Sequence, residues 1–267
     1  LQRGPAEYDL FLRPDLHTHG HTQWFYFALR GTHPPGVVGE SAIRFNIVNL
    51  TKPDSLFAMG MRPVLYSHHE ATTRGLGWRR CGHEINYRSN GYTWHKPDGS
   101  QGSFYTLSFS VTFLHPGDTY RLAHAHPYSY SDHKRHLAQL LADERRARYL
   151  TQRVSCTTLG GNECDLLTIT DSEERPIVDT GGSAGAGVRE RATKCCVVIS
   201  SRVHPGETPA SWMMRGMLDF ITGESAEARL LRSLFVFKIV PMLNPDGVAY
   251  GNNRCRQACL ACSTCGG

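Results

Sequence analysis

His204 and Glu207 stand three residues apart on a predicted turn, and their side chains are two of the ligand types that zinc takes in catalytic sites. The apolar, β-branched run over 195–201 that precedes them is typical of a strand buried on both faces. Pro205 and Gly206 end this strand. A catalytic zinc takes three protein ligands and leaves one position to water, so the pair would supply two. A solvated turn is the alternative, because His-x-x-Glu by itself is a common spacing.

The elements around the pair predict an open α/β sheet. Thr208 is a predicted helix cap, and Pro209 suits the first position of a helix that extends to about Ile221. A second apolar strand follows over 234–240. Strand, helix and strand in this order predict a parallel crossover unit, and such sheets carry their sites on loops at the carboxyl ends of strands.

Residues 202–208, which contain the pair, and 241–248 closely resemble the cytosolic carboxypeptidases. These are the tubulin-deglutamylating branch of the carboxypeptidase A-like zinc peptidases. The similarity extends from about residue 7 to Arg254 and includes 23–27 and 127–131. It implies zinc as cofactor, His204 and Glu207 as metal ligands, and Arg254 as the catalytic arginine that stabilises the oxyanion. Tubulin or other glutamate-tailed proteins are the implied partners.

The predicted fold is an all-β antiparallel sandwich over 1–130, followed over 131–267 by a truncated α/β carboxypeptidase-like domain with a mixed sheet. Alternating residues over 42–49 and 105–113 predict strands with one apolar face. Ser131 is the predicted cap of a helix that extends to Leu150. The Gly-rich stretch 171–194 is predicted as a loop. His17, His19 and His21 would share one face of an extended segment, as a metal site or as a polar loop.

Composition restricts the class of protein. Hydrophobic content of 40% and charged content of 20% are those of a soluble globular protein, and no apolar run reaches the length of a membrane span. A net charge of +5 favours acidic partners, and no nucleic-acid recognition motif is present. Nine cysteines without a secretory signal predict reduced thiols in the cytosol, with association to microtubules or cilia implied by the resemblance.

The resemblance ends at Cys255. The family continues into an Asp-Leu-Asn-Arg stretch that holds the substrate's terminal carboxylate, then a third zinc ligand and a catalytic Glu, and 255–267 matches none of these. We therefore expect a chain that is truncated within the peptidase domain and catalytically incomplete, so that its status as an enzyme stays uncertain. A non-catalytic isoform that binds tubulin or another protein is the alternative. The four tail cysteines predict either a structural zinc site or an artefactual end: Cys255, Cys259, Cys262 and Cys265.

Overall fold

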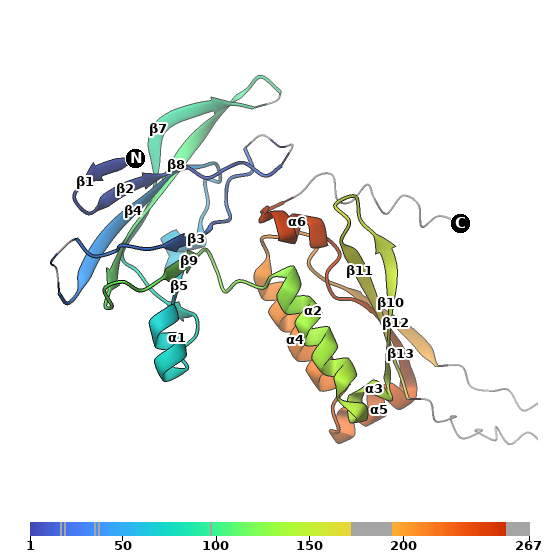
Figure 1. The fold of residues 1–267 in the computed structure, drawn as a ribbon. Helices are drawn as coiled ribbons and strands as arrows, with labels where there is room; N and C mark the ends of the chain where they lie inside the picture. The colour runs from blue at the N-terminus through green and yellow to red at the C-terminus, as the bar shows by residue number, and fades with distance from the viewer. Residues whose placement is uncertain are drawn as a thin grey trace, which may run out of the picture. The chain divides into compact units, whose positions relative to one another are not determined.

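A computed structural model describes residues 1–254 except 17, 19, 35, 37, 97 and 172–193. The tail cysteines, the Gly-rich loop and two of the three clustered histidines thus lie outside the described residues. The described part forms two compact units (Figure 1). The first contains Leu1–Pro127, His204–Thr208 and the segment from Gly247, and the second contains Tyr128–Val203 and Pro209–Asp246.

Two sheets form most of the first unit. One has the strand order β1-β2-β4-β8-β7, with bounds Gln2–Gly4, Glu7–Leu10, Ser41–Leu50, Gln101–Phe113 and His83–His95. The other has the order β3-β9-β5-β6, with bounds Tyr26–Leu29, Tyr120–Ala123, Val64–Ser67 and Arg79–Arg80. A short 3-10 helix, Leu56–Met59, and the helix α1, His68–Arg74, complete the unit.

A single hydrophobic core joins the two sheets. Phe45 and Ile47 of β4 and Phe109 of β8 are buried in it together with Leu122 of β9. The alternation predicted for β4 and β8 is therefore confirmed, because each strand presents every second side chain to this core. The strictly antiparallel arrangement is wrong, since β2 pairs with β4 in parallel. The sequence reasoning missed β2, which is only four residues long.

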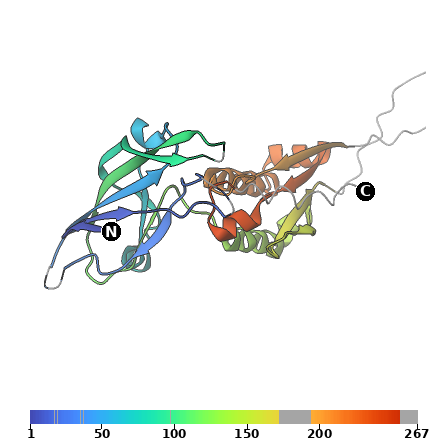
Figure 2. The same ribbon diagram turned by 90° about the horizontal axis from the view of Figure 1, so that it is seen from above.

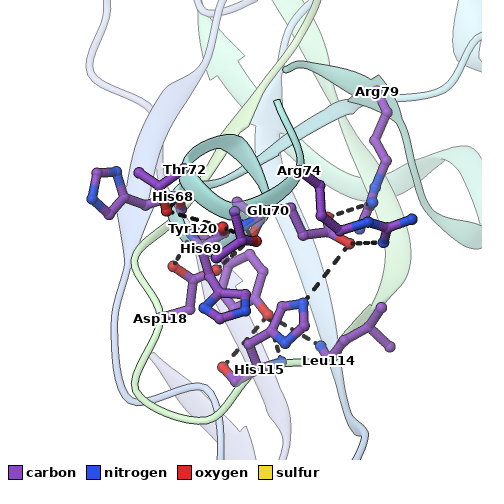
Figure 3. A network of polar contacts seen from close by, with 12 residues as sticks. His68, His69, Glu70, Thr72, Arg74, Arg79, Leu114, His115, Asp118 and Tyr120 are labelled. Carbon is purple, nitrogen blue, oxygen red and sulfur yellow. Dashed lines mark hydrogen bonds and ion pairs between the residues drawn. The ribbon is translucent and has the colours of Figure 1, made fainter. Parts of the chain in front are cut away.

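A polar network fixes α1 to the turn before β9 (Figure 3). Glu70 is 3% exposed and forms ion pairs with Arg79 and, at 3.6 Å, with Arg74. Asp118 accepts hydrogen bonds from the Ser67 hydroxyl at 2.5 Å and from the His69 backbone amide at 3.0 Å. The burial of Glu70 is tolerated because two arginines compensate its charge.

The second unit is built on the mixed sheet β10-β11-β13-β12, with bounds Leu150–Thr157, Glu163–Ile169, Phe235–Val240 and Cys195–Ser200. Only β12 and β13 pair in parallel, through the crossover that contains α4, Thr208–Ile221, and α5, Ala226–Leu234. Helices α2, Tyr130–Ala142, and α3, Glu144–Ala147, precede the sheet, and α6, Pro245–Tyr250, follows it. None of the helices in the described part of the chain is both long and apolar enough to cross a membrane.

Helices α2 and α4 cover one face of this sheet (Figures 1 and 2). Leu137 of α2 and Leu218 of α4 pack with Phe237 and Ile239, which are 7% and 0% exposed. A peptidase domain cut short, as the sequence predicts, should expose apolar surface around Val197, Ile199, Phe237 and Ile239. This expectation is wrong for Phe237 and Ile239, while Val197 and Ile199 are partly exposed. The exposed side chain is Val198, at 74%, because it alternates onto the opposite face of β12.

The start of α2 also differs from the prediction. Ser129 is its N-cap, with a hydroxyl that accepts from the Asp132 amide, while the Asp132 carboxylate accepts from the Ser129 amide. This reciprocal pair begins the helix one residue before Ser131, the predicted cap. The helix also ends at Ala142 instead of Leu150, because Asp143 caps a separate short helix.

Candidate metal and substrate site

The loop between β12 and α4 carries the candidate metal pair. The Ser201 amide donates to the Val240 carbonyl at 3.0 Å, which extends the parallel pairing by one residue. Arg202 then takes a left-handed conformation, with φ of 58°, and donates from its buried guanidinium to the Ser211 hydroxyl at 2.6 Å. This conformation is uncommon for a residue other than glycine, and it turns the chain sharply away from the strand.

Helix α4 begins at Thr208, one residue before Pro209, the predicted first position, so the predicted cap is wrong. Thr208 is fully buried, and its hydroxyl oxygen has no hydrogen-bond partner among the described residues. The turn is closed instead by the backbone, since the Glu207 amide donates to the His204 carbonyl at 3.2 Å.

His204 and Glu207 point their side chains toward each other across this turn. The Nδ1 atom of His204 lies 3.1 Å from the Oε1 atom of Glu207. Two ligand atoms bound to zinc at about 2.1 Å in tetrahedral geometry lie about 3.4 Å apart, so this separation is compatible with one shared ion. Both side chains are partly exposed, at 39% and 55%, which leaves the ligand atoms accessible.

Gly206 allows a close approach between this loop and the segment that carries Arg254. Its amide donates to the Asn253 carbonyl at 3.0 Å. A Cβ atom at Gly206 would lie 2.4 Å from Oδ1 and 3.0 Å from Cα of Asn253, so only glycine fits. As a result, Nη2 of Arg254 lies 3.9 Å from Oε1 of Glu207.

Asp15 holds the Arg254 segment in place. Its carboxylate is 6% exposed and accepts from the backbone amides of Asn253, at 2.7 Å, and of Arg254. The Leu16 amide donates to the Asn252 side chain at 3.3 Å beside it. Burial raises the pKa of Asp15, and the two backbone amides and His21 oppose that shift. The net shift is upward, so the hydrogen bonds that position Arg254 offset only part of the effect of burial on this carboxyl group.

A pocket of about 570 Å³ lies within the first unit next to Glu207 and Arg254. Its other walls come from the β-rich part of the chain, including His21, Lys52, Trp94 and His124. The pocket and the two candidate site residues thus belong to the same compact unit. A ligand held there would lie against Glu207 of the candidate metal pair and against Arg254.

Zinc fits these residues in part. An imidazole nitrogen and a carboxylate oxygen are ordinary zinc ligands, and their separation suits one ion. No cluster of three or more His, Cys, Asp or Glu side chains able to hold a metal occurs in the part of the chain that the structure describes. The described residues therefore offer two ligands, and a third would come from elsewhere.

Comparisons with known proteins agree with this geometry. A family model described as zinc carboxypeptidase matches residues 139–262. Cytosolic carboxypeptidase 2 of Homo sapiens is 44% identical over 252 residues, which are 94% of this chain and 26% of the relative. Cytosolic carboxypeptidase 3 of Mus musculus is 43% identical over 253 residues, covering 94% of this chain and 23% of the relative. The chain thus spans roughly a quarter of the length of these relatives.

The chain is a homologue of the cytosolic carboxypeptidases. The family predicted from residues 202–208 and 241–248 is therefore confirmed, and zinc use is a property of that family. Solved structures support the fold of this cytosolic carboxypeptidase homologue. A metallo-carboxypeptidase from Burkholderia cenocepacia has a TM-score of 0.61 at 22% identity, covering 92% of this chain and 53% of the other. A metallo-carboxypeptidase from Pseudomonas aeruginosa has a TM-score of 0.58 at 22% identity, covering 95% of this chain and 54% of the other.

Several site residues of this carboxypeptidase homologue escaped the sequence reasoning. Asp15, Lys52 and His124 lie in the β-rich region, far along the chain from His204. No local pattern distinguishes them, because a polar residue in a loop has the same appearance whether or not it faces a site. Asp246, at the start of α6, has a buried carboxylate that accepts from Thr158, from the Gly160 amide at 2.9 Å and from Asn162 at 2.8 Å.

Proposed function

We propose that this site is that of a zinc carboxypeptidase, which removes carboxyl-terminal or side-chain glutamates from tubulin and other acidic-tailed proteins in the cytosol. The observation that carries the proposal is the convergence of three side chains. His204 and Glu207 lie 3.1 Å apart, and Arg254 lies 3.9 Å from the same carboxylate oxygen. The homology to cytosolic carboxypeptidases supports the substrate class.

Each residue has a distinct role in this proposal. His204 and Glu207 would hold the zinc ion, which when bound polarises a carbonyl and lowers the pKa of bound water. Arg254 carries a permanent charge in a planar group, and it would hydrogen-bond the carbonyl oxygen as negative charge develops there. Asp15 acts through the backbone of Arg254, so it is a positioning residue.

The first test measures zinc and turnover with one variant. We expect His204→Ala to weaken zinc binding by about tenfold or more, because it removes one of the two ligands that these residues supply. Chelator competition measures the affinity, and His83→Ala, an exposed histidine outside the site, is the control. Turnover is measured by mass spectrometry on a glutamate-tailed peptide, with the longest natural polypeptide that carries these residues. Unchanged zinc affinity and turnover in His204→Ala would contradict the proposal.

A non-catalytic binding role is the second candidate for a polypeptide of these 267 residues by itself. It is favoured by the pocket next to Glu207, which has Lys52 and Arg254 on its walls and suits an acidic peptide whether or not turnover occurs. On this reading the 267 residues bind zinc weakly and release no glutamate, while the pocket still takes an acidic peptide. Chelator-sensitive glutamate release by this polypeptide would exclude the second candidate.

A further inference from the structure

Lys52 is an unpaired cation on the wall of the pocket next to the candidate metal pair. It makes no side-chain hydrogen bond or ion pair with any of the described residues, whereas its backbone carbonyl accepts from Tyr87. Arg254 is the other permanent cation that lines the pocket. A ligand with two carboxylates could therefore find one cation near the metal pair and another on the β-rich wall.

His124 lines the pocket together with Lys52 and adds no charge at neutral pH. Its ring is enclosed by aromatic side chains, with ring centroids 5.6 Å from Phe25, 5.2 Å from Phe57 and 5.8 Å from Trp24. Burial, together with the nearby Lys52 charge, lowers the pKa of His124 to about 4. The imidazole is thus neutral where the enzyme would work, and Lys52 remains the permanent cation on this wall.

Asp54 is the acidic residue next to Lys52 on the pocket wall, and its negative charge opposes the binding of a carboxylate there. It also lines the pocket, two residues after Lys52, and it is exposed. The two side chains form no ion pair in the structure, so Asp54 does not neutralise Lys52 by direct contact. A carboxylate in the pocket would be attracted by one of these residues and repelled by the other, which makes their effects on binding opposite in sign.

We infer that Lys52 forms a second carboxylate subsite, which binds a glutamate side chain upstream of the residue that is removed. This inference rests on the proposed function and deepens it, since it assigns recognition of an acidic tail to a residue of the β-rich region. Exposed charges are screened by salt, so this contribution falls as ionic strength rises. The subsite would select peptides with several consecutive glutamates over peptides with only a terminal one.

The fluorescence of Trp94 can be used to measure peptide binding in the pocket. Trp94 lines the pocket and packs directly over Gly20, where a Cβ atom would lie 2.2 Å from its ring. Its fluorescence should report occupancy of the pocket without any turnover, and Trp94→Phe checks the origin of the signal. The probes are two peptides, Gly-Glu-Glu-Glu-Glu and Gly-Gln-Gln-Gln-Glu, which share the terminal glutamate and differ upstream.

We expect the wild-type protein to bind the glutamate peptide more tightly than the glutamine peptide at low salt. Lys52→Met should reduce that preference by about tenfold, the effect of a charge-assisted contact of moderate strength. Lys52→Arg should retain the preference, and Asp54→Asn should increase it. Arg80→Met, which removes an exposed cation of the same unit outside the pocket, should leave it unchanged.

Two results would overturn the inference. One is an equal affinity of the wild-type protein for both peptides, and the other is an equal loss of preference in Lys52→Met and Arg80→Met. The proposed function is tested separately, through zinc affinity and glutamate release in His204→Ala. A protein that releases glutamate but shows no Lys52-dependent preference would keep the proposed function and lose the subsite.

Discussion

Gly206 shows how much of the site depends on one missing Cβ atom. The backbone around it contacts Asn253, and the neighbouring residues on the two segments are Glu207 and Arg254. The three-residue spacing of His204 and Glu207 was enough to predict that they share a turn. The position of Arg254 beside them came only from the family resemblance, because the contact with Asn253 is between segments almost fifty residues apart.

At this scale we predict that Gly206→Ala separates the guanidinium from the metal pair. The added methyl would meet Cα of Asn253 at 3.0 Å, so the segment has to shift, at a cost of about 1–3 kcal/mol in the free energy of unfolding. Zinc affinity and urea unfolding measure the two effects. Gly216→Ala in α4 is the control, because open space surrounds it and the change should stabilise the helix by about 0.5–1 kcal/mol. Equal effects of both variants would refute this account.

Among the elements, α2 and β11 are joined by a buried carboxylate. Asp165 is 1% exposed and accepts from His133 at 2.9 Å, Lys134 at 2.9 Å and Gln152 at 2.6 Å. Burial favours the neutral acid, but the three hydrogen bonds outweigh it and lower the pKa of Asp165 below its ordinary value of 3.8. The carboxylate therefore stabilises the fold above that value, and its contribution is lost as the pH falls through the lowered pKa.

We predict that Asp165→Asn lowers the free energy of unfolding by about 3 kcal/mol at neutral pH, because it removes the buried counter-charge of the Lys134 ammonium and leaves it only the exposed carboxylate of Glu163. The variant should also lose less stability between pH 4 and pH 2 than the wild type, on the order of one charge's contribution. Urea unfolding at several pH values measures both. Glu163→Gln removes the exposed partner of the same lysine and should cost less than about 1 kcal/mol.

The sequence predicted the elements of this unit better than their ends. The apolar runs over 195–201 and 234–240 form the predicted strands β12 and β13, which pair in parallel. The predicted burial of the first run on both faces is wrong, because β12 exposes Cys196, Val198 and Ser200 along one face. The end of α2 was wrong since Asp143 forms a cap that competes with continuation of the helix. The exposure expected at Phe237 and Ile239 from a shortened domain is wrong, because side chains of α2 and α4 cover these two residues.

At the scale of the whole molecule, the outer edge of the second sheet exposes apolar side chains. Strand β12 pairs with β13 alone among the described strands, and Val198 is 74% exposed on it. The neighbouring thiols of Cys195 and Cys196 are exposed as well. An unpaired strand edge with apolar side chains is a template for association with another chain.

We predict that Val198→Lys reduces aggregation of the protein without loss of stability, since charge on an edge strand opposes pairing with a second copy. Light scattering during incubation at about 37 °C measures association, and urea unfolding measures stability. The control is Ile199→Lys, which places the charge against the core that covers the other face and should unfold the second unit. Faster scattering by Val198→Lys would refute the role of this edge.

The hydrogen bond between Asp15 and the Asn253 amide has a consequence for synthesis on the ribosome. Its two residues are 238 positions apart in the chain. At a translation rate of about 5–20 residues per second, the first partner waits roughly 10–50 s for the second. During that interval the pocket lacks the wall formed by Asn253 and Arg254, and the buried carboxylate of Asp15 has neither backbone donor. A nascent chain should therefore acquire its β-rich core well before it acquires a site.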